Sequence, residues 1–378
     1  MLIELLTTLA PLIEATIKIV GLVFMVILPL VSLSVYAERR FSAVLQDRVG
    51  PNRVGIPYTK IRFAGLGQPL ADGLKFILKE DLTPDHVRKT YYWLAPAMAL
   101  VPALLTCAVL PFGGYLKLPF IDQPFQLAIA DLDVGILFVF AIASLGVYGI
   151  VLAGWASNSK YPFLGGVRSS CQMISYEIAL GLSVVPILMI YGDLNLNGIV
   201  QQQHQSGWVL LPVTFDGFTP VFDWRSVALL VPIAISFVIF TTSLFAETNR
   251  LPFDLPECET ELVAGYHTEY SSMKFALFFM GEYAAMIIGS GFAVTLFFGG
   301  WALPFGWGGD GSESLFWGLV NIGTFFAKVI GFILFFIWVR WSIPRFRYDQ
   351  LMRLGWVFFF EIALANIFLT ALILMIFR

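Results

Sequence analysis

The sequence predicts an all-α integral membrane protein with eight transmembrane helices. Of its 378 residues, 58% are hydrophobic and only 13% are charged, whereas soluble domains average roughly 25% charged residues. The apolar segments are long enough to cross ~30 Å of hydrocarbon as helices. They lack the two-residue alternation of transmembrane barrel strands, which favours helices over a barrel. We therefore expect a single membrane domain over residues 1–378.

Eight segments have the required length and composition. The predicted spans are about 16–37, 92–112, 133–156, 171–191, 227–246, 275–298, 318–339 and 356–377. The N-terminus lacks a basic region followed by a small-residue cleavage site, so we expect the first span to be retained.

The distribution of Lys and Arg orients these spans. The loops 38–91, 157–170, 247–274 and 340–355 together carry 18 basic residues, whereas the loops on the other side carry 2. Basic residues concentrate on the cytoplasmic side of membrane proteins. We therefore expect these four loops to be cytoplasmic and both termini to lie on the outer, periplasmic side.

The first inward loop contains a predicted amphipathic helix. In GLGQPLADGLKFILKEDL, five apolar residues share one helical face, while charged residues occupy the rest; the five are Leu66, Leu70, Leu74, Ile77 and Leu78. Such a helix lies along the inner interface, either covering the bundle or gating a ligand. The outward stretches 191–208 and 299–314 are rich in Gly, Gln, Asn and Trp and are predicted to be surface loops.

Several cofactor chemistries are absent from the sequence. The three histidines, His86, His204 and His267, lie between the predicted spans, so no histidine within a span can bind a haem. The three cysteines are scattered without a Cys-x-x-Cys pair, which excludes an iron–sulfur cluster held by this chain alone. We find no metal-binding cluster and no nucleotide-binding glycine motif. The small net charge of −3 gives no reason to expect nucleic acid.

Four charged residues fall within the predicted spans: Glu177, Glu282, Glu361 and Lys328. A charge in hydrocarbon costs about 2.5–3.5 kcal/mol on insertion scales, so each needs a reason. The glutamates either join helices through hydrogen bonds or, for Glu177 and Glu282, exchange protons as a relay. Lys328 lies near the middle of the seventh span and is a possible partner of a buried glutamate.

The stretch AETNRLPFDLPECETELVAGYHTEY, residues 246–270, concentrates negative charge between the fifth and sixth spans. Its six carboxylates are Glu247, Asp254, Glu257, Glu259, Glu261 and Glu269, and its one Lys or Arg is Arg250. It could be a solvated acidic loop. Its two Leu-Pro steps and its continuity with the span that carries Glu282 favour another interpretation. Closely spaced carboxylates share protons, so the loop would lead protons from the inner face towards Glu282 and Glu177.

At these residues the sequence resembles the membrane-arm quinone-chamber subunit of the proton-pumping NADH:quinone oxidoreductase, respiratory complex I. The resemblance runs nearly end to end and is carried by AERRFSAVLQDRVGPNRVG (37–55), GQPLADGLKFILKED (67–81), GWASNSKYPFLGGVRSSCQMISYE (154–177), the acidic loop 246–270, FALFFMGEY (275–283) and PRFRYDQLMRLGW (344–356). It implies that the chain forms the membrane part of the quinone tunnel and the start of the proton pathway. It also implies that partner subunits contain the iron–sulfur cluster and the residues nearest the quinone headgroup.

The resemblance assigns roles residue by residue. It implies a quinone chamber lined by Glu38, Arg39, Gln46, Arg48, Asp72, Phe279, Tyr283, Arg345 and Arg347. It implies a proton relay formed by Glu247, Asp254, Glu257, Glu259, Glu261, Glu269, Glu282 and Glu177. For Arg345 and Arg347, ordinary flanking positive charge is an alternative.

We therefore expect a component of a redox-driven proton pump that binds quinone but is not catalytic alone, with no metal, flavin, haem or iron–sulfur cluster of its own. Expected partners are the hydrophilic quinone-site and iron–sulfur subunits, small and antiporter-like membrane subunits, and lipid. The expected location is the inner (plasma) membrane of a bacterium, with the mitochondrial inner membrane as the alternative. The equivalent subunit of a membrane-bound hydrogenase or another donor:quinone complex, a freestanding ion transporter and a purely structural anchor are the alternative functions.

Overall fold

The structure is a computed structural model of the chain, and it describes residues 15–55, 62, 64–117, 125–211, 213–216, 219–222, 224–312 and 314–377. Eight helical segments in these residues are long and apolar enough to cross a membrane: Ala15–Leu45, Lys89–Val109, Gly135–Ala156, Lys160–Tyr191, Trp224–Glu247, Ser272–Phe297, Leu315–Ser342 and Tyr348–Ile376. The predicted fold class, an all-α protein with eight candidate spans, is confirmed.

The first four spans are built from six long elements. A π-helical stretch, Leu22–Ile27, leads into α2 (Leu28–Leu45), and the second span is α4 (Lys89–Thr106) with a 3₁₀ turn at Cys107–Val109. The third span consists of α5 (Gly135–Ala143) and α6 (Leu145–Ala156), and the fourth is α7 (Lys160–Tyr191). Helix α7 is 32 residues long and begins within the segment 157–170, which was predicted to be a loop.

The remaining spans are α9 (Trp224–Glu247), α11 (Ser272–Phe297) and α12 (Leu315–Ser342), followed by a composite last span. That span consists of α13 (Tyr348–Arg353), a π-helical stretch at Leu354–Phe359 and α14 (Phe360–Ile376). Because the helix begins at Tyr348 rather than near 356, Glu361 lies deeper than predicted, and its side chain is exposed on the outside of the chain.

Short elements occupy the connections. The predicted amphipathic helix is α3 (Gln68–Leu78), and the acidic loop contains α10 (Glu259–Leu262) and a 3₁₀ turn at Gly265–His267. Two hairpins pair β1 (Tyr115–Leu116) with β2 (Phe125–Gln126) and β3 (Val213–Asp216) with β4 (Thr219–Phe222). A 3₁₀ turn lies at Pro304–Gly306.

The outward stretch 191–208 is not the irregular loop that its composition predicted, because Leu196–Ser206 forms helix α8. The Asn195 side chain caps this helix by accepting hydrogen bonds from the backbone N–H groups of Asn197 and Gly198. Leu196, Ile199 and Val200 are buried, so packing stabilises a helix whose sequence looks polar.

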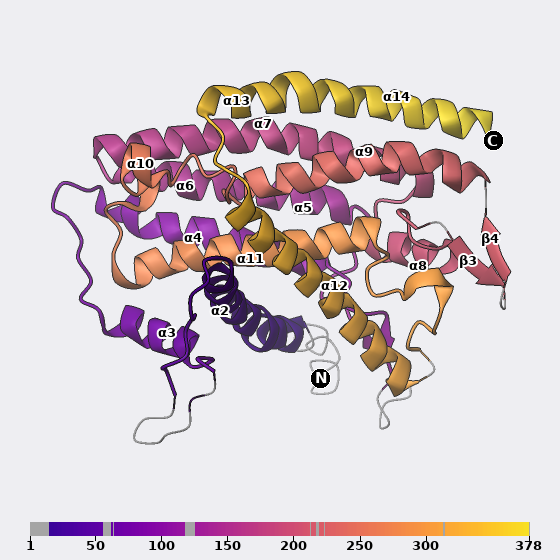
Figure 1. Cartoon of the computed structure of the whole chain (residues 1–378), viewed down its shortest axis with the longest axis horizontal. Coiled ribbons are helices and arrows are strands. Elements are labelled where there is room, and N and C mark those ends of the chain that lie inside the picture. Colours follow the sequence, from indigo (N-terminus) through magenta and orange to yellow (C-terminus); the bar gives the residue numbers. More distant parts are fainter. Residues whose placement is uncertain are drawn as a thin grey trace, which may run out of the picture.

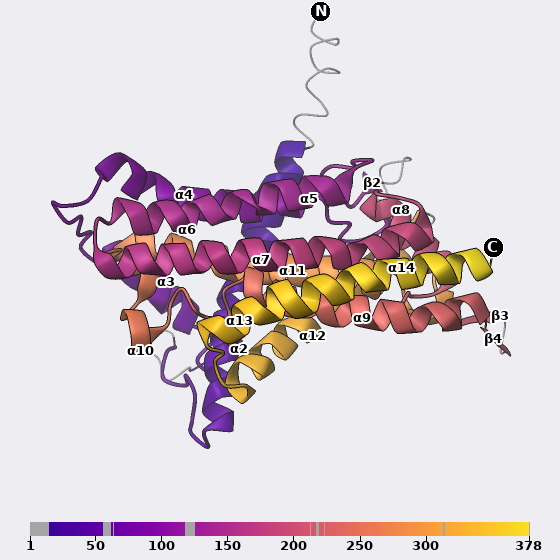
Figure 2. The same ribbon diagram turned by 90° about the horizontal axis from the view of Figure 1, so that it is seen from above.

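Helix α11 is the most buried of the eight candidate spans and packs against α4, α2 and α12. Figure 1 shows α13 and α14 covering α7 and α9, with α11 beneath them and α2, α3 and α12 on the opposite side. Figure 2 shows the long helices running side by side, with α10 at one end and α8, β3, β4 and the C-terminus at the other.

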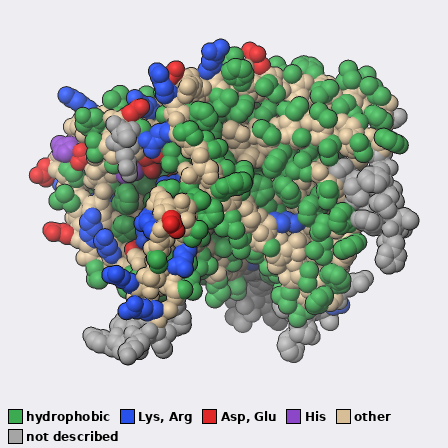
Figure 3. Space-filling model, viewed as in Figure 1, with side chains coloured by type: hydrophobic (Ala, Val, Ile, Leu, Met, Phe, Trp, Pro, Cys, Tyr) green, Lys and Arg blue, Asp and Glu red, His purple; other side chains and the backbone are tan. Residues whose placement is uncertain are grey.

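Charged side chains gather at the end that contains α3 and α10, while the rest of the visible surface is largely apolar (Figure 3). Helix α3 is tied to this end by two contacts. The Arg39 guanidinium lies 2.6 Å from the Asp72 carboxylate, and the Ser272 hydroxyl donates to the Phe76 carbonyl at 2.8 Å. These contacts fix α3 against α2 and α11, next to the acidic loop.

Candidate functional site

A buried guanidinium forms the centre of the site. Arg250 follows α9 and is 3% exposed. Its Nη1 donates to Glu38 Oε2 on α2 at 2.8 Å, and its Nε pairs with the Glu282 carboxylate on α11. Burial opposes the charge of Arg250, but Glu282 and Glu38 outweigh this effect and keep its pKa well above the usual value. Arg250 therefore remains protonated and joins the chain after α9 to two spans.

Two more side chains complete the contacts of Glu38. The Tyr283 hydroxyl donates to Glu38 Oε2 at 2.7 Å, and the Arg340 guanidinium on α12 lies 2.5 Å from Glu38 Oε1. The Arg250 guanidinium also lies over the Tyr283 ring, 3.9 Å from its centroid. Four separate segments thus meet at one network of two carboxylates, two guanidiniums and a phenol, which we call the Arg250 network. A buried network of this kind is stable only while every member keeps its partner.

A second ion pair lies further along the acidic loop. Arg345 Nη2 donates to Asp254 Oδ2 at 2.8 Å, and Arg345 Nη1 donates to Cys258 Sγ at 2.9 Å. Asp254 is buried, and this burial raises its pKa although Arg345 and Arg340 act in the opposite direction. The loop between α9 and α11 is therefore held to the segment that precedes α13.

Glu257 has the most unusual protonation in this loop. The Tyr266 hydroxyl donates to Glu257 Oε1 at 3.2 Å, and His267 Nδ1 lies 3.4 Å from the same oxygen. Burial, and secondarily the charge of Asp254, raise the pKa of Glu257 to about 7. Burial lowers the pKa of His267 to about 4, so the imidazole is neutral near pH 7. Glu257 is consequently a carboxyl group that can gain or lose a proton at neutral pH.

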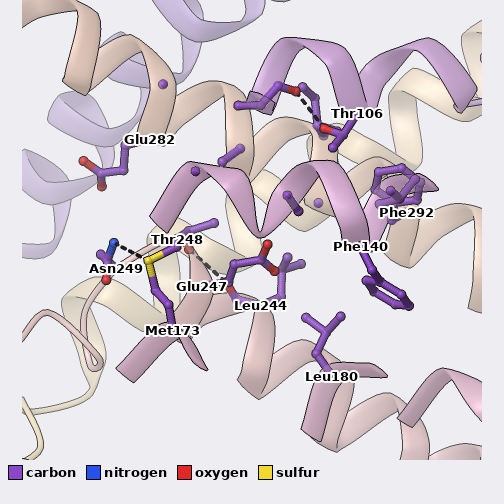
Figure 4. A pocket seen from close by; sticks show the side chains of 18 of the residues that line it. Thr106, Phe140, Met173, Leu180, Leu244, Glu247, Thr248, Asn249, Glu282 and Phe292 are labelled. Atoms are coloured by element: carbon purple, nitrogen blue, oxygen red, sulfur yellow. Dashed lines mark hydrogen bonds between the residues drawn. The ribbon is translucent and has the colours of Figure 1, made fainter. Parts of the chain in front are cut away.

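A largely apolar cavity of about 130 Å³ extends from this site into the bundle. Its wall comes from α4, α5, α6, α7, α9 and α11, and it includes Tyr266 and the two carboxylates Glu247 and Glu282. Figure 4 shows Glu282 and Glu247 at separate places on the wall, with Asn249 and Met173 nearby. Glu177 on α7 lies close enough to Glu247 for the two carboxylates to interact electrostatically. Glu282 thus belongs both to the Arg250 network and to the cavity.

Gln172 on α7 fixes the start of the acidic loop. It is fully buried, and its Nε2 donates to the carbonyls of Ala246 at 2.8 Å and Phe253 at 2.7 Å. On the same helix, a Cβ added at Gly165 would lie 2.7 Å from the Tyr266 nitrogen, so a glycine is required for the loop to approach this closely. Helix α7 therefore acts as the platform on which the loop rests.

The comparisons with known proteins cover the whole site. A family model described as NADH dehydrogenase matches residues 17–371. Similar proteins include the H subunits of several bacterial NADH-quinone oxidoreductases. The chain is 47% identical to the second H-type form of Koribacter versatilis, over 96% of this chain and 97% of the relative. It is 44% identical to the first form of Cytophaga hutchinsonii, over 97% and 98%, and 46% identical to the first form of Geobacter metallireducens, over 94% and 95%.

The chain belongs to the family of NADH-quinone oxidoreductase H subunits. It is a multi-pass membrane subunit of complex I, as the resemblance in the sequence predicted. It is therefore part of a multi-subunit oxidoreductase.

The structure places the predicted chamber residues of this complex I subunit in three groups. Glu38 and Tyr283 belong to the Arg250 network, and the Phe279 ring lies 4.9 Å from the Tyr283 ring. Arg39 and Asp72 pair with each other beside α3, and Arg48 Nε donates to Gln46 Oε1 at 2.7 Å on an exposed surface. Arg345 contacts the acidic loop, whereas the exposed Arg347 pairs only with the neighbouring Asp349 within the described residues.

The predicted relay residues are also divided. Asp254, Glu257, Glu282, Glu247 and Glu177 lie along the network and the cavity, as described above. Glu261 pairs with Arg168 on α7, and Glu269 lies 4.0 Å from His86, so both lie at separate positions. The side chain of Glu259 is outside the described part of the structure.

The expectation that Lys328 pairs with a buried glutamate is wrong. Its Nζ donates to the carbonyls of Phe298, Gly300 and Ala302 at 2.7–2.8 Å, and it lies over the Trp208 ring. These carbonyls follow the end of α11, where helical hydrogen bonding leaves carbonyl groups without partners. A backbone turn, rather than a carboxylate, is what stabilises the ammonium group.

Sequence analysis missed Arg340, Gln172 and the central role of Arg250. Arg340 lies at the end of α12, where positive charge is normally explained by membrane orientation alone. Gln172 carries no charge and has no motif around it. Only the packing of α7 against α9 shows that it holds the loop.

Proposed function

We propose that this protein forms the membrane wall of the quinone chamber of complex I and begins the proton pathway that quinone reduction drives. Helices α2, α3 and α11 contact one another and would frame the chamber. The Arg39–Asp72 pair, Phe279 and Tyr283 supply the polar and aromatic side chains suited to a quinone ring and its carbonyl oxygens. The chain contributes no electron donor in this proposal. Partner subunits supply the electrons, and the protein is not catalytic alone.

The single observation that carries the proposal is the position of Glu282. It pairs with Arg250 in the network that contains Glu38 and Tyr283, and it lines the cavity that also contains Glu247. A change of charge in the chamber would alter the balance between Glu38, Arg250 and Glu282. Glu282 would then exchange a proton with the cavity, which is large enough to hold water molecules.

The acidic loop would supply protons to this point. Glu257 titrates near neutral pH and interacts electrostatically with Glu282, and Asp254 interacts with Glu257. From Glu247 and Glu177, the change of charge would pass to antiporter-like membrane subunits. The excess of Lys and Arg places the acidic loop on the cytoplasmic side of a bacterial plasma membrane, with both termini on the other side.

The experiment is to substitute Glu282→Gln and Glu177→Gln together and to measure protons translocated per electron in vesicles that contain the complex. The amides keep size and hydrogen bonding but cannot titrate. The proposal expects fewer protons per electron, or loss of NADH-driven quinone reduction if the two processes are strictly linked. Unchanged turnover with an unchanged ratio would contradict it.

A further inference from the structure

A shallow groove crosses the outer surface of the bundle where α4 begins, α6 ends and α7 begins. It is lined by Tyr91, Val151, Leu152, Trp155, Phe163 and Val167. The aromatic members Tyr91, Trp155 and Phe163 are 39–48% exposed. The groove lies apart from the cavity of the proposed proton pathway and shares no lining residue with it.

Basic residues stand at the charged end of this groove. Arg88 precedes α4, Lys89 is its first residue, and Lys160 is the first residue of α7; all three are exposed. The Arg88 guanidinium lies over the Trp155 ring, 4.2 Å from its centroid. The backbone N–H of Arg88 donates to the Ala156 carbonyl at 3.0 Å, which holds the start of α4 against the end of α6.

These cations are not neutralised within the chain. In the part of the chain that the structure describes, no carboxylate forms an ion pair with Arg88, Lys89 or Lys160. Arg168, one turn beyond the groove on α7, pairs instead with Glu261. Helices α4 and α7 both begin here, and the positive ends of their dipoles add to the attraction for an anion.

We propose that this groove binds an anionic phospholipid of the inner leaflet. One acyl chain lies along the apolar wall, and the phosphate lies among Arg88, Lys89 and Lys160. Unpaired basic residues between transmembrane helices on the cytoplasmic side recognise anionic headgroups, and interfacial Trp and Tyr lie at headgroup depth. An apolar groove that ends in three unpaired cations matches the shape and charge of such a lipid.

The experiment uses the whole complex in its membrane and two photoactivatable lipids, a phosphatidylglycerol and a phosphatidylcholine with the same diazirine-bearing acyl chain. After illumination, labelled peptides are mapped. The site predicts that phosphatidylglycerol labels the segments 88–93 and 151–167 several-fold more than phosphatidylcholine does. The Arg88→Gln, Lys160→Gln double variant should lower the phosphatidylglycerol labelling on the order of tenfold, since each interfacial cation contributes about fivefold.

Arg353→Gln is the matched control. Arg353 is also exposed, and its guanidinium lies 5.9 Å from the Phe358 ring centroid on another helix. Its substitution should leave labelling of the groove unchanged. Equal labelling by the two lipids, or cross-linking of the groove to a partner protein in place of lipid, would overturn the proposal. If the double variant fails to assemble, the ratio of the two lipids on the wild-type complex still decides. Because proton translocation is not measured, failure of this proposal is independent of the proposed function.

Discussion

Arg250 and Glu38 are separated by 212 residues in the chain, yet Arg250 Nη1 lies 2.8 Å from Glu38 Oε2. Both side chains are buried, and the same guanidinium pairs with Glu282. This contact joins the first span, the acidic loop and the most buried span. It is the physical connection between the wall of the proposed chamber and the cavity inside the bundle.

Removing the guanidinium leaves two buried carboxylates with too little positive charge. Arg250→Gln should therefore lower the stability of the folded protein by about 3–5 kcal/mol, the usual cost of breaking a buried ion pair. We expect reduced assembly of the complex and a lower thermal midpoint. Arg250→Lys should restore only part of the loss, because an ammonium group cannot pair with two carboxylates in the planar geometry of guanidinium. An Arg250→Gln complex as stable as one carrying Arg353→Gln would contradict this prediction.

Glu257 should give the complex a specific dependence on pH. Its pKa is raised to about 7, so its contribution to stability is complete below its unfolded pKa near 4.5 and is lost as pH rises through 7. Between pH 6 and pH 8 this loss amounts to about 1 kcal/mol. His267, with its pKa lowered to about 4, contributes with the opposite sign over the same interval.

The difference between wild type and Glu257→Gln isolates the Glu257 contribution, because His267 is present in both. The measurement is the thermal midpoint of the purified complex at pH 6 and pH 8. Wild type should lose more stability than the variant on going to pH 8. Parallel shifts in the two proteins would mean that Glu257 does not titrate in this range.

Gly165 tests whether α7 is the platform of the acidic loop. A Cβ at this position would lie 2.7 Å from the Tyr266 nitrogen, so Gly165→Ala should push Tyr266 and its partner Glu257 out of place. We expect a lower thermal midpoint and a loss of quinone reductase activity. Gly181→Ala, in the same helix with nothing within 4 Å of the added Cβ, should be neutral or slightly stabilising because alanine favours helix. Equal effects of the two substitutions would refute the platform role.

Lys328 is expected to act on stability and not on coupling. Lys328→Met keeps the length of the side chain but leaves three carbonyl groups, those of Phe298, Gly300 and Ala302, without this donor. Each lost hydrogen bond to a charged group costs about 1.5–3 kcal/mol. The amount of assembled complex should fall, while the complex that does assemble should translocate the normal number of protons per electron. A normal yield with a reduced ratio would instead show that Lys328 belongs to the proton pathway.

The sequence was sufficient for the spans because long apolar segments and the distribution of Lys and Arg depend on the membrane itself. It failed for α8, whose polar residues conceal the three buried positions that stabilise it. It identified Glu38 and Glu282 through family resemblance, but their joint contact with Arg250 and the addition of Arg340 depend on how α2, α11 and α12 meet. A lysine within a span suggested a carboxylate partner, and the carbonyl groups after α11 could not be foreseen from residue types.

The most direct test of the central claim concerns Glu247, which lines the cavity together with Glu282 but lies outside the Arg250 network. The measurement is the number of protons translocated per electron, together with the rate of NADH-driven quinone reduction, for Glu247→Gln in membrane vesicles. Glu361→Gln, the same substitution at an exposed position on α14, is the control. Our account expects Glu247→Gln to lose turnover or protons per electron while Glu361→Gln keeps both. If Glu247→Gln also keeps both, the cavity is not part of the proton pathway.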